Sequence, residues 1–256
     1  MEREHALTTT KSLGPALLRA QLFNLGAYPG TRKGKGIVVG EVRAVTPEML
    51  SLLDDIEGHR EGDPENSLFF RQKIAVTLFA DGRTVQAWCY YAQKEGEEII
   101  RHGDYRRWRL EKKGGPFLLL SYGSNLSAGR LEERIGALGK REPGSIIGFR
   151  LVFNKASKDG SAKANLQWSS ESASCPAVAD ILTSEKIARL DTFEGTPYHY
   201  LRIVIQFKST PHSSPRLAQT YIASPGKLND SLAVSKNYLD LIRNGYQELG
   251  FTFPEC

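Results

Sequence analysis

The feature that most constrains the fold is a repeat within the chain. Thr46–Gly58 (TPEMLSLLDDIEG) aligns without a gap to Thr183–Gly195 (TSEKIARLDTFEG), with identity at six of thirteen positions. The similarity continues through two further pairs of segments, Phe69–Arg71 with Tyr200–Arg202 and Ala87–Tyr90 with Ala218–Tyr221. Each copy reads as a strand, a short helix, a Glu-Gly turn and two further strands, so the repeat predicts two related domains in tandem.

The domain boundary is expected between the two copies. The stretch 94–113 holds 12 charged side chains among 20 residues and is followed by Gly114-Gly115-Pro116. Charged runs and Gly-Pro steps are typical of solvated domain edges, which gives expected domains of 1–113 and 117–256. Arg106-Arg107-Trp108-Arg109 is interpreted as surface at this edge. Nucleic-acid binding is the weaker alternative, because acidic residues offset the charge and aromatic residues are sparse.

Composition excludes several classes of protein. The 256 residues are 40% apolar and 25% charged with a net charge of +5, which is typical of a soluble globular chain. No apolar run approaches the ~18 residues that a membrane helix needs, and the N-terminal segment has no secretory signal. The three cysteines lie far apart, and the five histidines have no metal-ligand spacing. We therefore expect a cytoplasmic protein with no metal site.

Hydrophobic periodicity predicts a mixed α+β fold. In the second half, strands are expected over 117–121, 146–153, 200–207 and 218–223, with helices over 126–135 and 234–245. In the first half, strands are expected over 21–25, 37–43, 72–79 and 85–92. Because strands outnumber helices and do not alternate with them regularly, each domain is expected to be a small mixed β-barrel with flanking helices.

Glu194 is the first candidate for chemistry. It ends the helix that Thr183 is expected to cap, and Gly195 stops that helix. A carboxylate at this end faces the negative pole of the helix macrodipole, so Lys or Arg would serve stability better. The second copy nevertheless has Glu57 at the same place. A single glutamate of this kind can be explained as a solvated helix end. The occurrence of the same glutamate in both copies instead favours a proton-transfer group.

The segment Ser121–Asn125 (SYGSN) is the second candidate. It lies where the buried strand 117–121 is expected to end and a helix to begin. Gly123 permits a tight turn and a close approach of a ligand to the backbone. The amides of such a turn can hold a carboxylate or a developing oxyanion, although a plain strand–helix turn with a capping residue is an equal alternative. Tyr200 and Tyr221, on the strands after the Glu194 helix, pack in the core or direct their hydroxyls into a pocket beside Glu194.

Together these residues resemble the gamma-glutamylcyclotransferase / AIG2-like superfamily. The second half, over about 117–251, is similar through the YGSN loop, FNKASKDGSAKAN (Phe153–Asn165), the LDTFEG helix end, Tyr200 with Arg202, and KNYLDLIRNG (Lys236–Gly245). The first half is similar to the smaller AIG2-like or gamma-glutamylamine cyclotransferase-like branch through LFNLGAYPG, GEV, LDDIEG, AWCYY and GDYRRW. Five motifs in the family's order make the resemblance of the second half specific.

The resemblance implies an enzyme that cyclises a small gamma-glutamyl compound to 5-oxoproline and releases an amine or amino acid, without a cofactor. Glu194 is implied as the catalytic residue. The implied substrate-binding residues are Leu119, Leu120, Ser121, Tyr122, Gly123, Ser124, Asn125, Tyr200 and Tyr221.

The sequence departs from the family pattern in both halves. No YGTL or YGSN loop precedes Leu22, so the first copy is expected to be incomplete and inactive, with Glu57 in a vestigial site. In the second copy Cys175-Pro176-Ala177 replaces the usual Trp-Gly or Tyr-Gly before the Glu194 helix.

Two alternatives to an enzyme remain open. A catalytically degenerate module would bind a small carboxylate or gamma-glutamyl metabolite in the same pocket. A basic nucleic-acid adaptor would bind with an affinity that falls steeply as salt rises.

Overall fold

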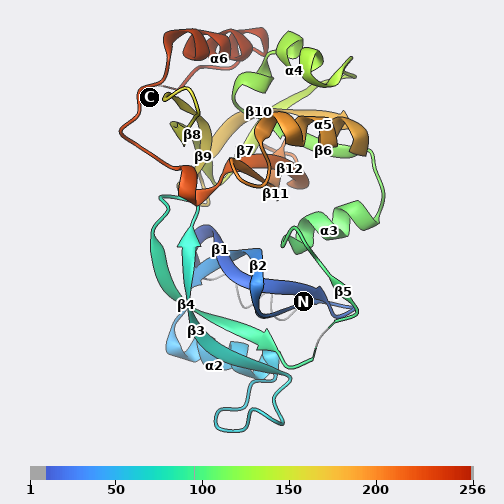
Figure 1. Cartoon of the computed structure of the whole chain (residues 1–256), viewed down its shortest axis with the longest axis vertical. Helices are drawn as coiled ribbons and strands as arrows, with labels where there is room; N and C mark the ends of the chain where they lie inside the picture. Colours follow the sequence, from blue (N-terminus) through green and yellow to red (C-terminus); the bar gives the residue numbers. More distant parts are fainter. Residues whose placement is uncertain (1–9, 95, 255–256) are drawn as a thin grey trace. The chain divides into compact units, whose positions relative to one another are not determined.

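The computed structural model describes residues 10–94 and 96–254 and divides the chain into two compact units. The first unit extends to Leu78 and continues from Arg83 to Trp108, and the second holds Phe79–Gly82 together with the chain from Arg109 onward. Both units combine helices with β-sheet (Figure 1), which confirms the predicted α+β class. No helix in the described ranges is long and apolar enough to cross a membrane.

The first unit is built on a five-stranded sheet. Strand β1 pairs with both β2 and β3, β3 pairs with β4, and β4 makes a parallel contact back to β2, so the pairings return on themselves. Its elements are β1 (Lys11–Asn24), β2 (Pro29–Ala44), α2 (Pro47–Glu57), β3 (Phe69–Leu78), β4 (Thr84–Ala92), β5 (Glu98–Ile99) and the first half of α3 (Tyr105–Lys112), whose residues from Arg109 onward belong to the second unit.

The second unit is a closed five-stranded barrel with the order β10-β6-β12-β11-β7. A separate two-stranded sheet, β8 with β9, extends from it (Figure 1). The elements are β6 (Phe117–Ser121), η1 (Ser124–Leu126), α4 (Ala128–Ile135), β7 (Glu142–Ile147), β8 (Phe149–Ala156), β9 (Ala162–Trp168), β10 (Ser174–Leu182), α5 (Ser184–Glu194), β11 (Tyr200–Lys208), β12 (Arg216–Ala223), η2 (Pro225–Lys227) and α6 (Lys236–Glu248).

The repeated helix forms in the same way in each unit. In α5 the Thr183 side chain accepts the Lys186 amide, and Gly195 closes the helix in the left-handed region at φ 65°. In α2 the Thr46 side chain accepts the Met49 amide, and Gly58 closes the helix at φ 61°. The capping threonine and the glycine stop predicted from the sequence are confirmed, and they fix where each final glutamate lies.

The core of the second unit forms where α4 and α5 pack on the barrel. It contains Leu119, Leu131, Leu182, Ile187 and Leu190, none more than 2% exposed. Burial of these side chains holds the end of β6 and the end of α5 on one side of the barrel. The first residues of the YGSN segment and Glu194 are thereby brought together.

Three sequence expectations about elements are wrong. The single strand expected over 146–153 is two strands, because Gly148 takes φ 91° and separates β7 from β8. No strand was expected over β9 or β10, although β10 is central to the barrel. The last helix continues to Glu248 rather than ending at Gly245, since Gly245 is needed inside α6: a Cβ there would lie 2.8 Å from Leu126 Cβ.

Candidate active site

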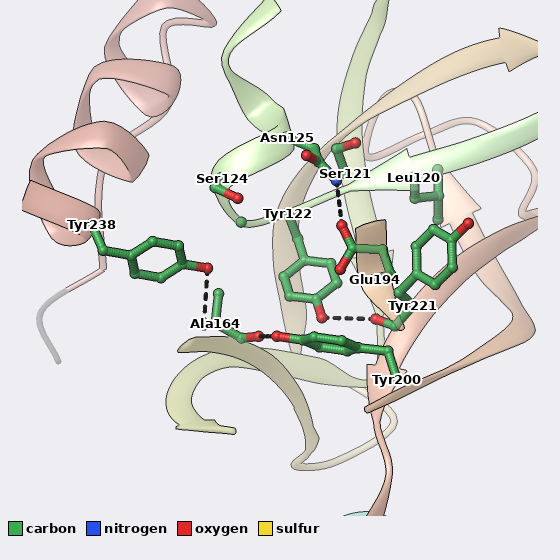
Figure 2. Close-up of a pocket in the computed structure, with 11 residues that line it drawn as sticks. Leu120, Ser121, Tyr122, Ser124, Asn125, Ala164, Glu194, Tyr200, Tyr221 and Tyr238 are labelled. Atoms are coloured by element: carbon green, nitrogen blue, oxygen red, sulfur yellow. Dashed lines mark hydrogen bonds between the residues drawn. The ribbon is translucent and has the colours of Figure 1, made fainter. Parts of the chain in front are cut away.

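A pocket lies in the second unit, beside the end of α5. It has about 330 Å³ of empty space, part of it open to solvent. Strand β6, the loop into η1, the end of α5, strands β9, β11 and β12, and helix α6 all contribute to its wall (Figure 2). Its lining residues are Leu120, Ser121, Tyr122, Gly123, Ser124, Asn125, Ala164, Glu194, Tyr200, Tyr221 and Tyr238.

Two hydrogen-bond donors hold the Glu194 carboxylate at this pocket. Asn125 Nδ2 lies 3.0 Å and Arg134 Nη1 2.9 Å from the same oxygen, Oε1. Both charged side chains are largely removed from water, with 16% of Arg134 and 14% of Glu194 exposed. Among the described residues no donor binds Oε2 of Glu194. One oxygen therefore anchors the carboxylate, and the other is available to a ligand.

Arg134 also offsets the unfavourable position of the Glu194 carboxylate at the end of α5. A carboxylate at the last position of α5 faces the negative end of the helix dipole. Arg134, on the neighbouring helix α4, supplies a positive charge at that end, and its guanidinium lies 5.3 Å from the centre of the Phe193 ring. Arg134 also donates to Asn125 Oδ1 at 2.9 Å, so the three side chains form one connected network.

The tyrosines around the pocket use their hydroxyls to tie its walls together. Tyr122 donates to the Tyr221 carbonyl at 2.7 Å, Tyr200 donates to the Ala164 carbonyl at 2.8 Å, and the Ala164 amide donates to Tyr238 at 3.2 Å (Figure 2). Burial raises the pKa of the Tyr122, Tyr200 and Tyr238 phenols, and nearby Glu194 adds to the rise. These groups therefore stay protonated and set the shape of the pocket.

The glycine of the YGSN segment is required by close packing. A Cβ on Gly123 would lie 2.9 Å from Ala164 Cβ, and the Gly123 carbonyl accepts the Leu126 amide at 2.9 Å to begin η1. The loop therefore turns tightly against β9, and its backbone borders the pocket.

A second network lies behind the pocket wall. Arg202 binds Asp191 through two nitrogens at 3.0 and 3.1 Å, and Tyr221 donates to Asp191 Oδ1 at 2.7 Å. The first unit has the same arrangement: Arg71 lies 2.6 Å and the Tyr90 hydroxyl 2.7 Å from Asp54. Burial and the adjacent aspartate raise the pKa of both tyrosines. Because both copies have it, this triad supports the helix–strand junction rather than chemistry specific to one unit.

The pocket brings together eight of the nine expected substrate-binding residues with Glu194. The exception is Leu119, which is 1% exposed and belongs to the core. Sequence reasoning missed Ala164, Tyr238 and Arg134. The first two lie within motifs quoted for the resemblance, FNKASKDGSAKAN and KNYLDLIRNG. Arg134 had only a weak signal, an arginine nine positions after Asn125.

In the first unit, Glu57 ends α2 and is 7% exposed. No Tyr-Gly-Ser-Asn sequence occurs in that unit. Across both units, no three His, Cys, Asp or Glu side chains of the described residues gather as ligands for a metal ion.

These features define a class of protein: a mixed α+β unit with a small barrel, a glycine loop after a buried strand, and a carboxylate at the end of a capped helix. Residues 1–107 match the sequence model of a family described as "Gamma-glutamyl cyclotransferase, AIG2-like". Over these residues the chain is similar to the AIG2-like gamma-glutamyl cyclotransferase family.

The solved structure of YkqA from Bacillus subtilis is similar over both units, with a TM-score of 0.71 and 16% identity. The match covers 96% of this chain and 87% of YkqA, so the two proteins share a fold. A "Gamma-glutamyl cyclotransferase" structure has a TM-score of 0.47 and 21% identity over 52% of this chain and 80% of its own. An uncharacterized protein from Homo sapiens has a TM-score of 0.46 and 22% identity over 52% of this chain and 80% of its own. No curated protein matches the chain.

Proposed function

We propose that the second unit is a gamma-glutamylcyclotransferase-type enzyme. It converts a gamma-glutamyl compound into 5-oxoproline and a free amine or amino acid. The observation that carries this proposal is that Glu194 and the Tyr122–Asn125 loop border the same pocket, with Asn125 Nδ2 3.0 Å from Glu194 Oε1. The family of residues 1–107 supports the same reaction class.

Glu194 acts as the proton carrier of the reaction. Its Oε2 takes a proton from the α-ammonium group of the substrate, while Asn125 and Arg134 hold Oε1 in place. The freed amine attacks the γ-carbonyl carbon of the same molecule, and a new C–N bond closes the five-membered ring. The original bond from that carbon to the leaving nitrogen breaks as Glu194 returns its proton to the departing nitrogen. Glu194 then takes the second proton from the ring nitrogen and passes it to the released amine, so the products are the neutral lactam of 5-oxoproline and an ammonium group. Atoms and charges balance without water, metal or cofactor.

The pocket contributes by orienting a flexible substrate. A glutamyl chain must fold back on itself before its amine reaches its γ-carbonyl, and a fixed pocket supplies that orientation in advance. The Tyr122–Ser124 backbone amides are placed in this proposal to hold the oxyanion or the substrate α-carboxylate. Tyr200 and Tyr221 shape the wall that contacts the glutamyl carbons.

The chemistry is tested with Glu194→Gln, which keeps the size and the hydrogen-bonding ability of the side chain but cannot carry the proton. We expect 5-oxoproline formation from a panel of gamma-glutamyl compounds to fall by at least about a hundredfold, with binding retained, since general acid–base catalysis contributes 10²–10⁴-fold. The matched control is Glu57→Gln at the equivalent position of the first unit, which we expect to leave turnover near the wild-type rate.

The outcomes separate the proposal from its alternatives. Wild-type turnover by Glu194→Gln would refute the role of Glu194. Ligand binding by the wild-type protein without product after long incubation would favour the degenerate binding module. A matching loss in Glu57→Gln would mean that the first unit is active as well.

A further inference from the structure

Two lysines face each other across the β8–β9 hairpin, next to the pocket. Lys155 and Lys163 are direct partners in the antiparallel register, so their side chains leave the same face of the sheet. Like charges at directly opposite positions destabilise a strand pair. The pair therefore costs stability in the unliganded protein, and this cost needs an explanation.

Lys155 is the more unusual of the two. It is only 6% exposed, and its ammonium makes no hydrogen bond or ion pair with any described residue. Its ammonium lies over the ring of Tyr200, whose centre is 5.0 Å from Nζ. A cation–π contact offsets only part of the cost of taking an ammonium out of water. Burial accordingly lowers the pKa of Lys155, and the charge of Glu194 opposes that shift.

The carboxylates near Lys155 are already engaged elsewhere. Glu194 is bound by Arg134 at 2.9 Å, and Asp159 is bound by Lys163 at 2.8 Å. Lys227 adds a further positive charge that acts on Lys155. Counted over these groups, four cations face two anions, so the surroundings of Lys155 carry an excess of positive charge.

Both lysines border the pocket through its tyrosines. Tyr200, under Lys155, donates to the Ala164 carbonyl at 2.8 Å, and Tyr238 accepts the Ala164 amide at 3.2 Å. Lys163 Nζ lies 4.7 Å from the centre of the Tyr238 ring. Ala164, Tyr200 and Tyr238 all line the pocket, so each ammonium group lies against an aromatic ring of the pocket wall.

We propose that Lys155, assisted by Lys163, forms an anion subsite that binds a carboxylate on the amine released by the reaction. The inference rests on the proposed function, because it deepens the substrate assignment of the same pocket. The glutamyl part already has partners there: Glu194 for its ammonium, and the Tyr122–Ser124 amides for its own carboxylate or for the oxyanion. A second carboxylate, on the leaving side, supplies the negative charge that Lys155 lacks. The preferred substrates are thus gamma-glutamyl derivatives of amino acids rather than of uncharged amines.

The test compares gamma-glutamyl-L-alanine with gamma-glutamyl-L-alaninamide, which has nearly the same size but no charge on its leaving part. Dissociation constants are measured by titration calorimetry, and kcat/KM is measured from released 5-oxoproline. We expect the wild-type protein to favour the acid by about tenfold or more, as for a hydrogen bond to a charged group. In Lys155→Met the acid-to-amide ratio should fall to near one, and in Lys155→Arg the preference should be largely kept.

The matched control is Lys236→Met, which removes an exposed lysine of the same unit whose side chain is 87% exposed. It should keep the wild-type ratio. Equal dissociation constants for the two compounds in the wild-type protein would overturn the anion subsite, whatever the turnover. Because this comparison uses only the wild-type protein, it does not depend on whether Lys155→Met folds. A preference that persists in Lys155→Met would overturn the role of Lys155. Binding that favours the acid without any 5-oxoproline would instead overturn the proposed reaction and leave the subsite standing.

Discussion

Replacing Arg134 by Met tests how much the pocket depends on the charge that holds its carboxylate. The ion pair spans 2.9 Å, and 16% of Arg134 and 14% of Glu194 remain exposed. Breaking a fully buried pair costs about 3–5 kcal/mol, and an exposed pair contributes about 0–1 kcal/mol. The intermediate burial places the loss near 2 kcal/mol. For a unit of this size that is a fall in Tm of roughly 6 °C.

The assay is thermal and urea unfolding of the variant beside Arg216→Met. Arg216 pairs with Glu142 at a similar distance, 2.6 Å, but with 46% and 39% of the two side chains exposed. We expect that control to lose under about 1 kcal/mol. Equal losses in the two variants, or a loss below 0.5 kcal/mol in Arg134→Met, would refute the argument from burial.

A double variant and the kinetics separate charge from packing. If the cost in Arg134→Met comes from an unpaired carboxylate, Glu194→Gln in the same chain should recover about half of it or more. Because Arg134 acts through Glu194, the single variant should lower kcat on the order of tenfold to a hundredfold and change KM much less. A rise in KM at constant kcat would instead make Arg134 a substrate-binding residue.

Two further predictions concern packing and burial. Gly245→Ala should destabilise the second unit by about 2 kcal/mol in urea unfolding, because the new Cβ would lie 2.8 Å from Leu126 Cβ and 3.0 Å from the Ser127 amide nitrogen. The control is Gly129→Ala, at a helical glycine with open space around it, which should raise the free energy of unfolding by about 0.5–1 kcal/mol. The opposite order of stabilities would contradict the packing argument. Cys175 should resist iodoacetamide at pH 8 in the folded protein and react after unfolding, because burial raises the pKa of its thiol to about 12. Mass spectrometry measures the labelling, and rapid labelling of Cys175 in the native protein would be inconsistent with that burial.

The sequence was sufficient where a local rule decides the structure. Thr183 and Gly195 delimit α5 through a side-chain cap and a left-handed glycine, and both signals can be read without coordinates. The short apolar run 117–121 predicts the buried strand that carries the YGSN segment, and this strand is β6. The end of β6 and the end of α5 are therefore predictable separately, but periodicity says nothing about their distance in space.

The expectations failed where packing overrides a local rule. Asn244-Gly245 is a good stop signal for a helix, yet α6 continues because Gly245 allows close contact with Leu126 and Ser127. Arg134 gave no clear signal for a similar reason. Its role depends on α4 and α5 lying side by side, and that arrangement comes from burial of Leu131 and Leu190 in a shared core.

Comparison of the two copies separates the contacts that both units share from those that only the second unit has. Asp54, Arg71 and Tyr90 repeat the contacts of Asp191, Arg202 and Tyr221, so this triad is explained by the need to join a helix to two strands. A glutamate before the helix-ending glycine also occurs in both copies and cannot by itself mark a catalytic site. What the second unit adds is Asn125 and Arg134 on one oxygen of Glu194, with a glycine loop across the pocket. A carboxylate held in this way has a fixed direction and one free oxygen, which is what transfer of a proton between two nitrogens requires.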